Sequence, residues 1–105
     1  MITDAHFKAR FRSRTSEEGG LASPLYTGYF PLFDFDGEHE DGGEITIIGA
    51  EMAMPGDEFM GEVEFLEIEE RHIEAIYPGA DFTVREKGKI VATGLVTEIY
   101  FEKSV

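Results

Sequence analysis

The chain has 105 residues, a length that fits one domain spanning 1–105 and leaves no room for a second. Its 22 Asp and Glu outnumber its 9 Lys and Arg, and the net charge of −13 gives a surface that repels nucleic acids and anionic lipids. Nine Phe and 42% apolar residues exclude a disordered acidic tail, and the absence of Cys excludes disulfides and thiolate metal sites.

No targeting or membrane segment is visible in the sequence. Residues 1–6 contain no apolar run of the kind that a secretory leader needs, and no stretch of about 18 apolar residues occurs. We therefore expect a cytoplasmic protein without a membrane partner.

The first half of the chain alternates apolar and polar residues, which is typical of half-buried strands. This period predicts strands over 7–12, 28–35 and 44–48. A turn is expected at 17–20 and a polar, Gly-rich loop at 37–43. Pro31 cannot donate a ladder hydrogen bond, so we expect an edge or a bulge there.

The second half continues the pattern with one ambiguous segment. Strands are predicted over 59–68, 81–86 and 90–101, and the last is apolar on both faces and therefore central. Ile73 and Ile76, spaced i and i+3, indicate one or two helical turns within 69–76. Six strands without a long helix predict a closed antiparallel barrel or a sandwich.

The alternation also predicts a core from the apolar face of each strand. We expect the following to be buried: Phe7, Phe11, Phe33, Phe35, Val63, Phe65, Phe82 and Val84.

Four short motifs occur in a fixed order along the chain. They are EEGGLASP at 17–24, GYFPLF at 28–33, MAMPGD at 52–57 and REKGKIVATGLV at 85–96. Together they resemble the C-terminal β-barrel domain of elongation factor Tu, whose pattern is EEGGRHTP, GYRPxF, MxMPGD and REGGRxVGxGVV. The resemblance covers nearly the whole chain, apart from an insertion between Glu67 and Ala80.

The resemblance implies an all-β, six-stranded antiparallel Greek-key barrel without chemistry of its own. In that family the domain packs on a GTPase domain, touches the backbone of aminoacyl-tRNA and meets the nucleotide-exchange factor. The 105 residues contain no GxxxxGK[ST] loop. We therefore expect no GTP binding, no cofactor, no metal and no enzyme activity.

The positions that face tRNA in the family are altered here. Leu21 and Ala22 stand where the family has Arg and His, and Glu67 stands where it has Lys. The resemblance leaves residues 85–87 as candidate binding residues, namely Arg85, Glu86 and Lys87, of which the last replaces a family Gly. Because backbone contacts on RNA depend on positive charge, we expect no useful affinity for tRNA.

The first strand carries a stripe of basic residues, namely Lys8, Arg10, Arg12 and Arg14. The stripe is either a small anion- or RNA-binding patch or one side of cross-strand pairs with acids such as Glu62 and Glu64. We favour the cross-strand pairs, because the rest of the chain is strongly acidic.

Two acidic segments contain residue types that can ligate metal ions. The loop around Asp34–Asp41 has His39 and Ile45 where a calcium EF-hand needs Gly and Glu, so we interpret it as a solvated turn. Glu69, Glu70, His72 and Glu74 allow a metal or acid–base site, but no second His lies close in sequence, which favours an exposed charged loop.

The aromatic residues between 26 and 35 allow stacking on bases, but they fit core packing better because little positive charge surrounds them. The leading hypothesis is therefore a non-catalytic binding module with a protein partner. One alternative is a translation-associated RNA-binding protein with reduced family contacts. Another is a small enzyme that uses the 67–80 loop, which we expect to project from the barrel.

Overall fold

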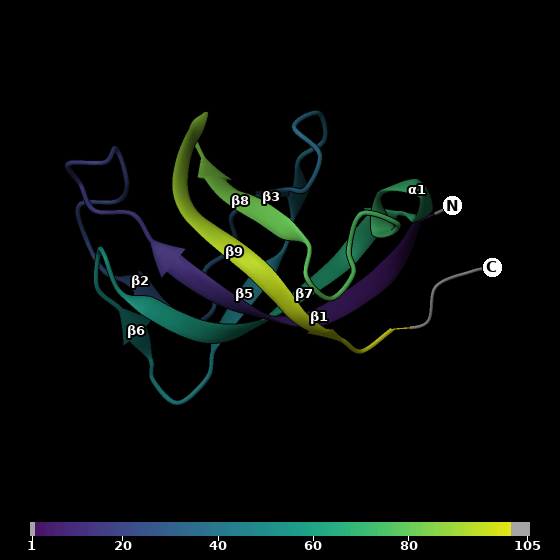
Figure 1. Cartoon of the computed structure of the whole chain (residues 1–105), viewed down its shortest axis with the longest axis horizontal. Coiled ribbons are helices and arrows are strands. Elements are labelled where there is room, and N and C mark those ends of the chain that lie inside the picture. Colours follow the sequence, from purple (N-terminus) through teal and green to yellow (C-terminus); the bar gives the residue numbers. More distant parts are fainter. Residues whose placement is uncertain (1, 102–105) are drawn as a thin grey trace.

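Nine β-strands and one helical turn build the described part of the chain, residues 2–101 of a computed structural model (Figure 1). The long strands are β1 (Ile2–Ser13), β7 (Glu58–Glu69), β8 (Asp81–Glu86) and β9 (Lys89–Ile99). The short ones are β2 (Leu25–Tyr26), β3 (Leu32–Asp34), β4 (Asp41–Gly42), β5 (Glu44–Ile47) and β6 (Met52–Ala53). The helical turn is α1 (Glu70–Ile73).

The main sheet curls until its two ends meet. Its order is β4-β3-β8-β9-β1-β7-β5, and all pairs are antiparallel. Only Gly43 separates β4 from β5, and the β5 residue Ile45 donates its backbone N–H to the carbonyl of Tyr29, just ahead of β3, at 2.9 Å. With β4 and β5 counted as one strand, six strands close a barrel, and β1 lies beside β7 as in a Greek key. The predicted fold class is confirmed.

The strand predicted over 28–35 is shorter than expected. Only Leu32–Asp34 pairs as β3, while Tyr29 forms an isolated bridge with Ile45. Pro31 interrupts the ladder because it has no N–H, although its carbonyl accepts a hydrogen bond from Gly43. The loop predicted over 37–43 is also partly wrong, because Asp41–Gly42 pairs with β3 as β4.

The barrel interior is filled by phenylalanine rings. All the predicted core residues are buried except Phe35, which is half-buried. Phe82 lies with its ring centroid 5.8 Å from that of Phe7 and 5.4 Å from that of Phe11. A Cβ atom at Gly94 would overlap the Phe82 ring, so the absence of a side chain on β9 is what admits this ring.

The segment 67–80 does not project as expected. Its first three residues end β7, and the rest forms α1 and then a loop at one end of the barrel, beside the start of β1 (Figure 1). Ile73 and Ile76 are buried in the core, whereas Tyr77 is exposed. The prediction of a loop standing free of the barrel is therefore wrong, because the insertion brings its own apolar residues to cover the open barrel end.

Phe82→Ala should lower the free energy of unfolding by about 3–5 kcal/mol, since it removes a buried ring and leaves a cavity among other rings. Phe30→Ala is the matched control, because this ring is 59% exposed and its loss should cost about 1 kcal/mol or less. Urea denaturation of both variants measures the difference, and equal costs would remove Phe82 from the core.

Candidate functional site

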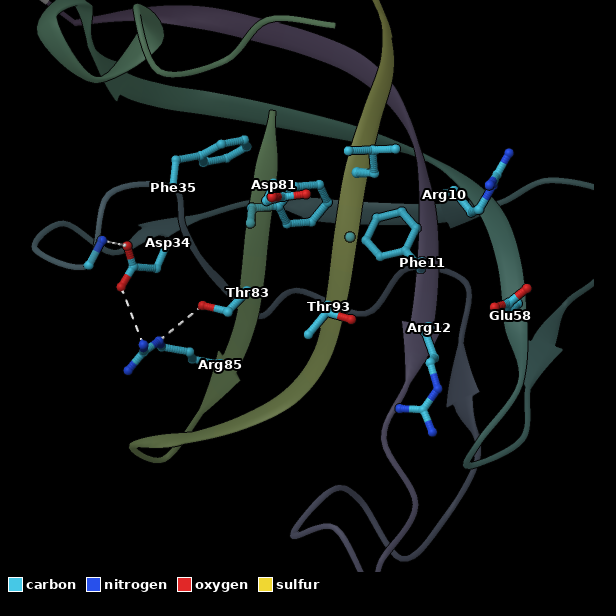
Figure 2. Close-up of a pocket in the computed structure, with 14 residues that line it drawn as sticks. Arg10, Phe11, Arg12, Asp34, Phe35, Glu58, Asp81, Thr83, Arg85 and Thr93 are labelled. Atoms are coloured by element: carbon cyan, nitrogen blue, oxygen red, sulfur yellow. Dashed lines mark hydrogen bonds and ion pairs between the residues drawn. The ribbon is translucent and has the colours of Figure 1, made fainter. Parts of the chain in front are cut away.

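A groove of about 520 Å³ crosses the β8, β9 and β1 part of the sheet (Figure 2). Its apolar lining includes Phe11, Phe35, Phe82 and Leu95, of which Phe11 and Phe82 are buried and Leu95 is 36% exposed. The polar lining comes from both rims: Arg10, Arg12, Asp34, Glu58, Asp81, Thr83, Arg85 and Thr93. This combination of an apolar floor and charged rims is typical of a binding site.

One rim is fixed by Asp34. Its side chain is only 5% exposed, and its Oδ1 accepts hydrogen bonds from the backbone N–H groups of Asp36 at 3.0 Å and Gly37 at 2.6 Å. Its Oδ2 lies 3.5 Å from a guanidinium nitrogen of Arg85, whose Nε donates to Thr83 Oγ1 at 3.2 Å (Figure 2). The Arg85 side chain is therefore held in place by two neighbours.

The other two candidate residues from the sequence lie away from the groove. Glu86 accepts a 2.7 Å hydrogen bond from the Tyr29 hydroxyl, and burial together with this carboxylate raises the pKa of Tyr29. Lys87 and Gly88 form the turn between β8 and β9 with φ angles of 51° and 79°, the left-handed conformation of a tight hairpin. The side chain of Lys87 is exposed at this turn. The structure does not bring the three together at one site.

The opposite rim comes from the basic stripe on β1. Arg12 pairs with Glu18 at 3.0 Å, and the pKa of Glu18 is lowered to about 2 by a hydrogen bond from the Thr15 backbone and by Arg12. Arg10 lies opposite Leu95 of β9. The register places Lys8 opposite Glu62 as predicted, yet within residues 2–101 the partner of Glu62 is His6, at 3.1 Å. Part of the stripe therefore faces the groove instead of pairing across strands.

A second polar cluster lies at the barrel end covered by α1. The rings of His39 and His72 are 4.3 Å apart between centroids. Nδ1 of His39 lies 2.7 Å from Asp36, and Nδ1 of His72 lies 3.1 Å from both carboxylate oxygens of Asp41. Sequence reasoning missed this cluster because the two histidines are far apart along the chain, and no local spacing signals their contact.

Of the residues that allow a metal or acid–base site around His72, the side chain of Glu70 lies outside the described part of the structure, and His72 and Glu69 contact other partners. His72 turns toward Asp41, and Glu69 pairs with Arg71 at 2.8 Å. In the acidic loop, Asp34 and Asp36 accept backbone hydrogen bonds, as in a turn stabilised by its own side chains. Within residues 2–101, no three His, Asp or Glu side chains are grouped so that they can hold a metal ion.

Comparison with known families agrees with this architecture. Residues 1–100 match the family described as Elongation factor Tu C-terminal domain. In the part of the chain that the structure describes, no helix is long and apolar enough to cross a membrane.

Asp34→Ala should destabilise the fold by about 2–3 kcal/mol, because two backbone N–H groups and Arg85 lose a buried acceptor. Asp81→Ala lies in the same groove but removes an exposed carboxylate, so its cost should stay within about 0.5 kcal/mol. Thermal unfolding of the two variants gives the comparison. Equal midpoints would show that Asp34 does not anchor the rim.

Proposed function

The chain belongs to the elongation factor Tu C-terminal domain family, and on this premise we propose that it is a non-catalytic binding module whose partner is a protein. The observation that carries the proposal is the groove, in which the partly exposed side chains of Phe35 and Leu95 lie between charged rims. Such a surface favours a protein segment that inserts an apolar side chain. We place the module in the cytoplasm, where translation factors of this family act.

The groove residues favour binding over catalysis. None of the three histidines lines the groove, so its Thr hydroxyls have no imidazole base beside them. Asp34 is occupied by two backbone N–H groups and Arg85. The alternative of an enzyme built on the 67–80 loop is weakened too, since Nε2 of His72, the nitrogen left free by the Asp41 contact, is buried away from a substrate.

Charge favours a partner with basic residues beside its apolar anchor. The net charge of −13 steers cations toward the protein over a long range. At the groove, Arg85 is matched by Asp34, and Arg12 by Glu18. Among the described residues, the carboxylates of Glu58 and Asp81 make no ion pair, against the single unpaired guanidinium of Arg10, so the groove keeps an excess of negative charge for a basic side chain.

The RNA-binding alternative has less support from the same residues. Glu67 is exposed where the family carries Lys, and Leu21 and Ala22 offer no positive charge to a phosphate. Arg85 is already paired with Asp34. Lys87 is the exposed cation that remains of the three candidate residues, and one contact of this kind supplies little affinity.

Selection of a displayed library of random peptides on the full chain tests the proposal. We expect enriched peptides to carry Lys or Arg beside an aromatic or aliphatic residue. Leu95→Arg should weaken their binding at least about tenfold, because it fills the groove and adds a like charge. Ile48→Arg is the matched control, since Ile48 is similarly exposed and does not line the groove.

Two outcomes would contradict the groove as the docking site. One is a library without enrichment, and the other is a set of peptides that bind the Leu95→Arg and Ile48→Arg variants equally. If the enriched peptides were acidic, the chain would still be a binding module, but its partner would carry negative instead of positive charge.

A gel-shift titration with aminoacyl-tRNA at low salt addresses the alternative, since electrostatic attraction is strongest there. We expect no salt-sensitive binding in the micromolar range. Micromolar binding that salt weakens and Arg85→Ala abolishes would replace the protein partner with RNA.

A further inference from the structure

Three exposed side chains of the groove form one line across the sheet. Asp81 of β8 lies opposite Leu95 of β9 in the strand register, and Leu95 lies opposite Arg10 of β1. Asp81 and Arg10 therefore lie on opposite sides of β9, as Figure 2 shows. The next row along β1 holds Arg12 opposite Glu58 of β7. The line thus runs from an acidic residue over an apolar residue to a basic residue.

The two charged ends of this line are available to a partner. Within residues 2–101, neither Asp81 nor Arg10 makes an ion pair. The other guanidinium groups of the groove, on Arg12 and Arg85, are each matched by a carboxylate of this chain. A bound segment therefore meets an unmatched acid on one side of Leu95 and an unmatched base on the other.

The pairing of the strands beneath the groove disfavours an extended partner. At Leu95, β9 is paired with β8 and with β1, and at Arg10, β1 is paired with β9 and with β7. Addition of a further strand needs an open row of N–H and C=O groups, and both rows are taken at these positions. An extended segment lying across the strands would also hold its own main-chain groups over apolar side chains without partners. A helix bonds its own main chain and presents only side chains.

The spacing of the line also fits a helix. Adjacent strands lie about 4.8 Å apart, so Asp81 and Arg10, which are two strands apart, are separated by about 10 Å. Residues i, i+4 and i+7 of a helix share one face and rise by about 10 Å. Three alternate residues of an extended chain span about 13 Å, which overshoots the line.

We propose that the segment bound in the groove is an amphipathic helix that lies across β8, β9 and β1 and carries a basic, an apolar and an acidic residue at i, i+4 and i+7. The basic residue pairs with Asp81, the apolar one packs on Leu95 and Phe35, and the acidic one pairs with Arg10. Turning the helix round reverses the order of the charges, so acidic–apolar–basic faces fit equally. The inference rests on the proposed function and adds to it the helical form and the acidic residue of the partner.

Three displayed libraries of helix-forming peptides test the inference on the full chain. Each library has Lys or Arg at i and random apolar residues at i+4, and the libraries differ only in Glu, Gln or Lys at i+7. We expect the Glu library to be enriched. Exchange of this Glu for Gln in an enriched peptide should weaken binding about fivefold, the effect of one partly exposed ion pair.

A proline exchange tests the helical form of the bound peptide. Position i+2 faces away from the groove, so a change there removes no contact with the protein. Pro at i+2 should weaken binding at least about tenfold, because it breaks the helix. Ala at the same position is the matched control and should leave binding unchanged.

A charge reversal on the protein tests the position of the acidic residue. Arg10→Glu should reverse the preference at i+7 from Glu to Lys. Arg14→Glu is the matched control, because Arg14 lies on the same stretch of chain and changes the net charge equally but does not line the groove. Arg10→Gln adds no negative charge and should make the Glu and Gln peptides bind equally, which keeps the test open if Arg10→Glu does not fold.

The outcomes separate this inference from the proposed function. Peptides that bind the groove but tolerate Pro at i+2, or that show no preference for Glu at i+7, would overturn the helical partner and leave a binding module. A preference for Glu that survives Arg10→Glu would do the same. A chain that enriches neither these peptides nor random ones would overturn the proposed function, and this inference with it.

Discussion

The closed barrel depends on the ring of Phe7, which contacts aromatic rings from several strands at once. Its centroid lies 6.5 Å from that of Phe33 near the closing edge of the sheet, 5.8 Å from that of Phe65 on β7 and 5.8 Å from that of Phe82 on β8. Phe33 and Phe82 meet Phe7 in edge-to-face geometry, the arrangement that aromatic pairs prefer. Phe35 and Phe82, which line the groove, both belong to this cluster of rings.

Much of the fold could be predicted because apolar and polar residues alternate along each half-buried strand, and this alternation is visible in the sequence. The apolar face of β7, with Val63 and Phe65 inward and Glu64 outward, is visible from the residues alone. The failures concern features that depend on distant partners. The strand predicted around Pro31 is shorter than expected because Pro31 has no N–H and only its carbonyl is bonded, to the N–H of Gly43. Ile76 is buried because it covers the end of the barrel.

The candidate sites were less predictable than the fold for the same reason. Arg85 was found through a family motif, but its pairing with Asp34 crosses from β8 to β3 and follows only from the register. The contact of His39 with His72 has no local pattern at all. Acidic residues that looked like a solvated run have defined roles, since Asp34 and Asp36 shape their loop through backbone amides.

The way in which the closing strand bends at Gly43 has a consequence for the behaviour of the protein in concentrated solution. A Cβ atom at this position would crowd the rings of Phe65 and Phe33, so the site admits no side chain without a shift of these rings. On either side of Gly43, β4 bonds to β3 and β5 bonds to β7, and the ladder thereby runs around the barrel. An open sheet of the same strands would offer its outer rows of N–H and C=O groups to a second molecule. A substitution at Gly43 is therefore expected to promote aggregation as well as to destabilise the fold, because it would expose these N–H and C=O groups to edge-to-edge pairing between chains.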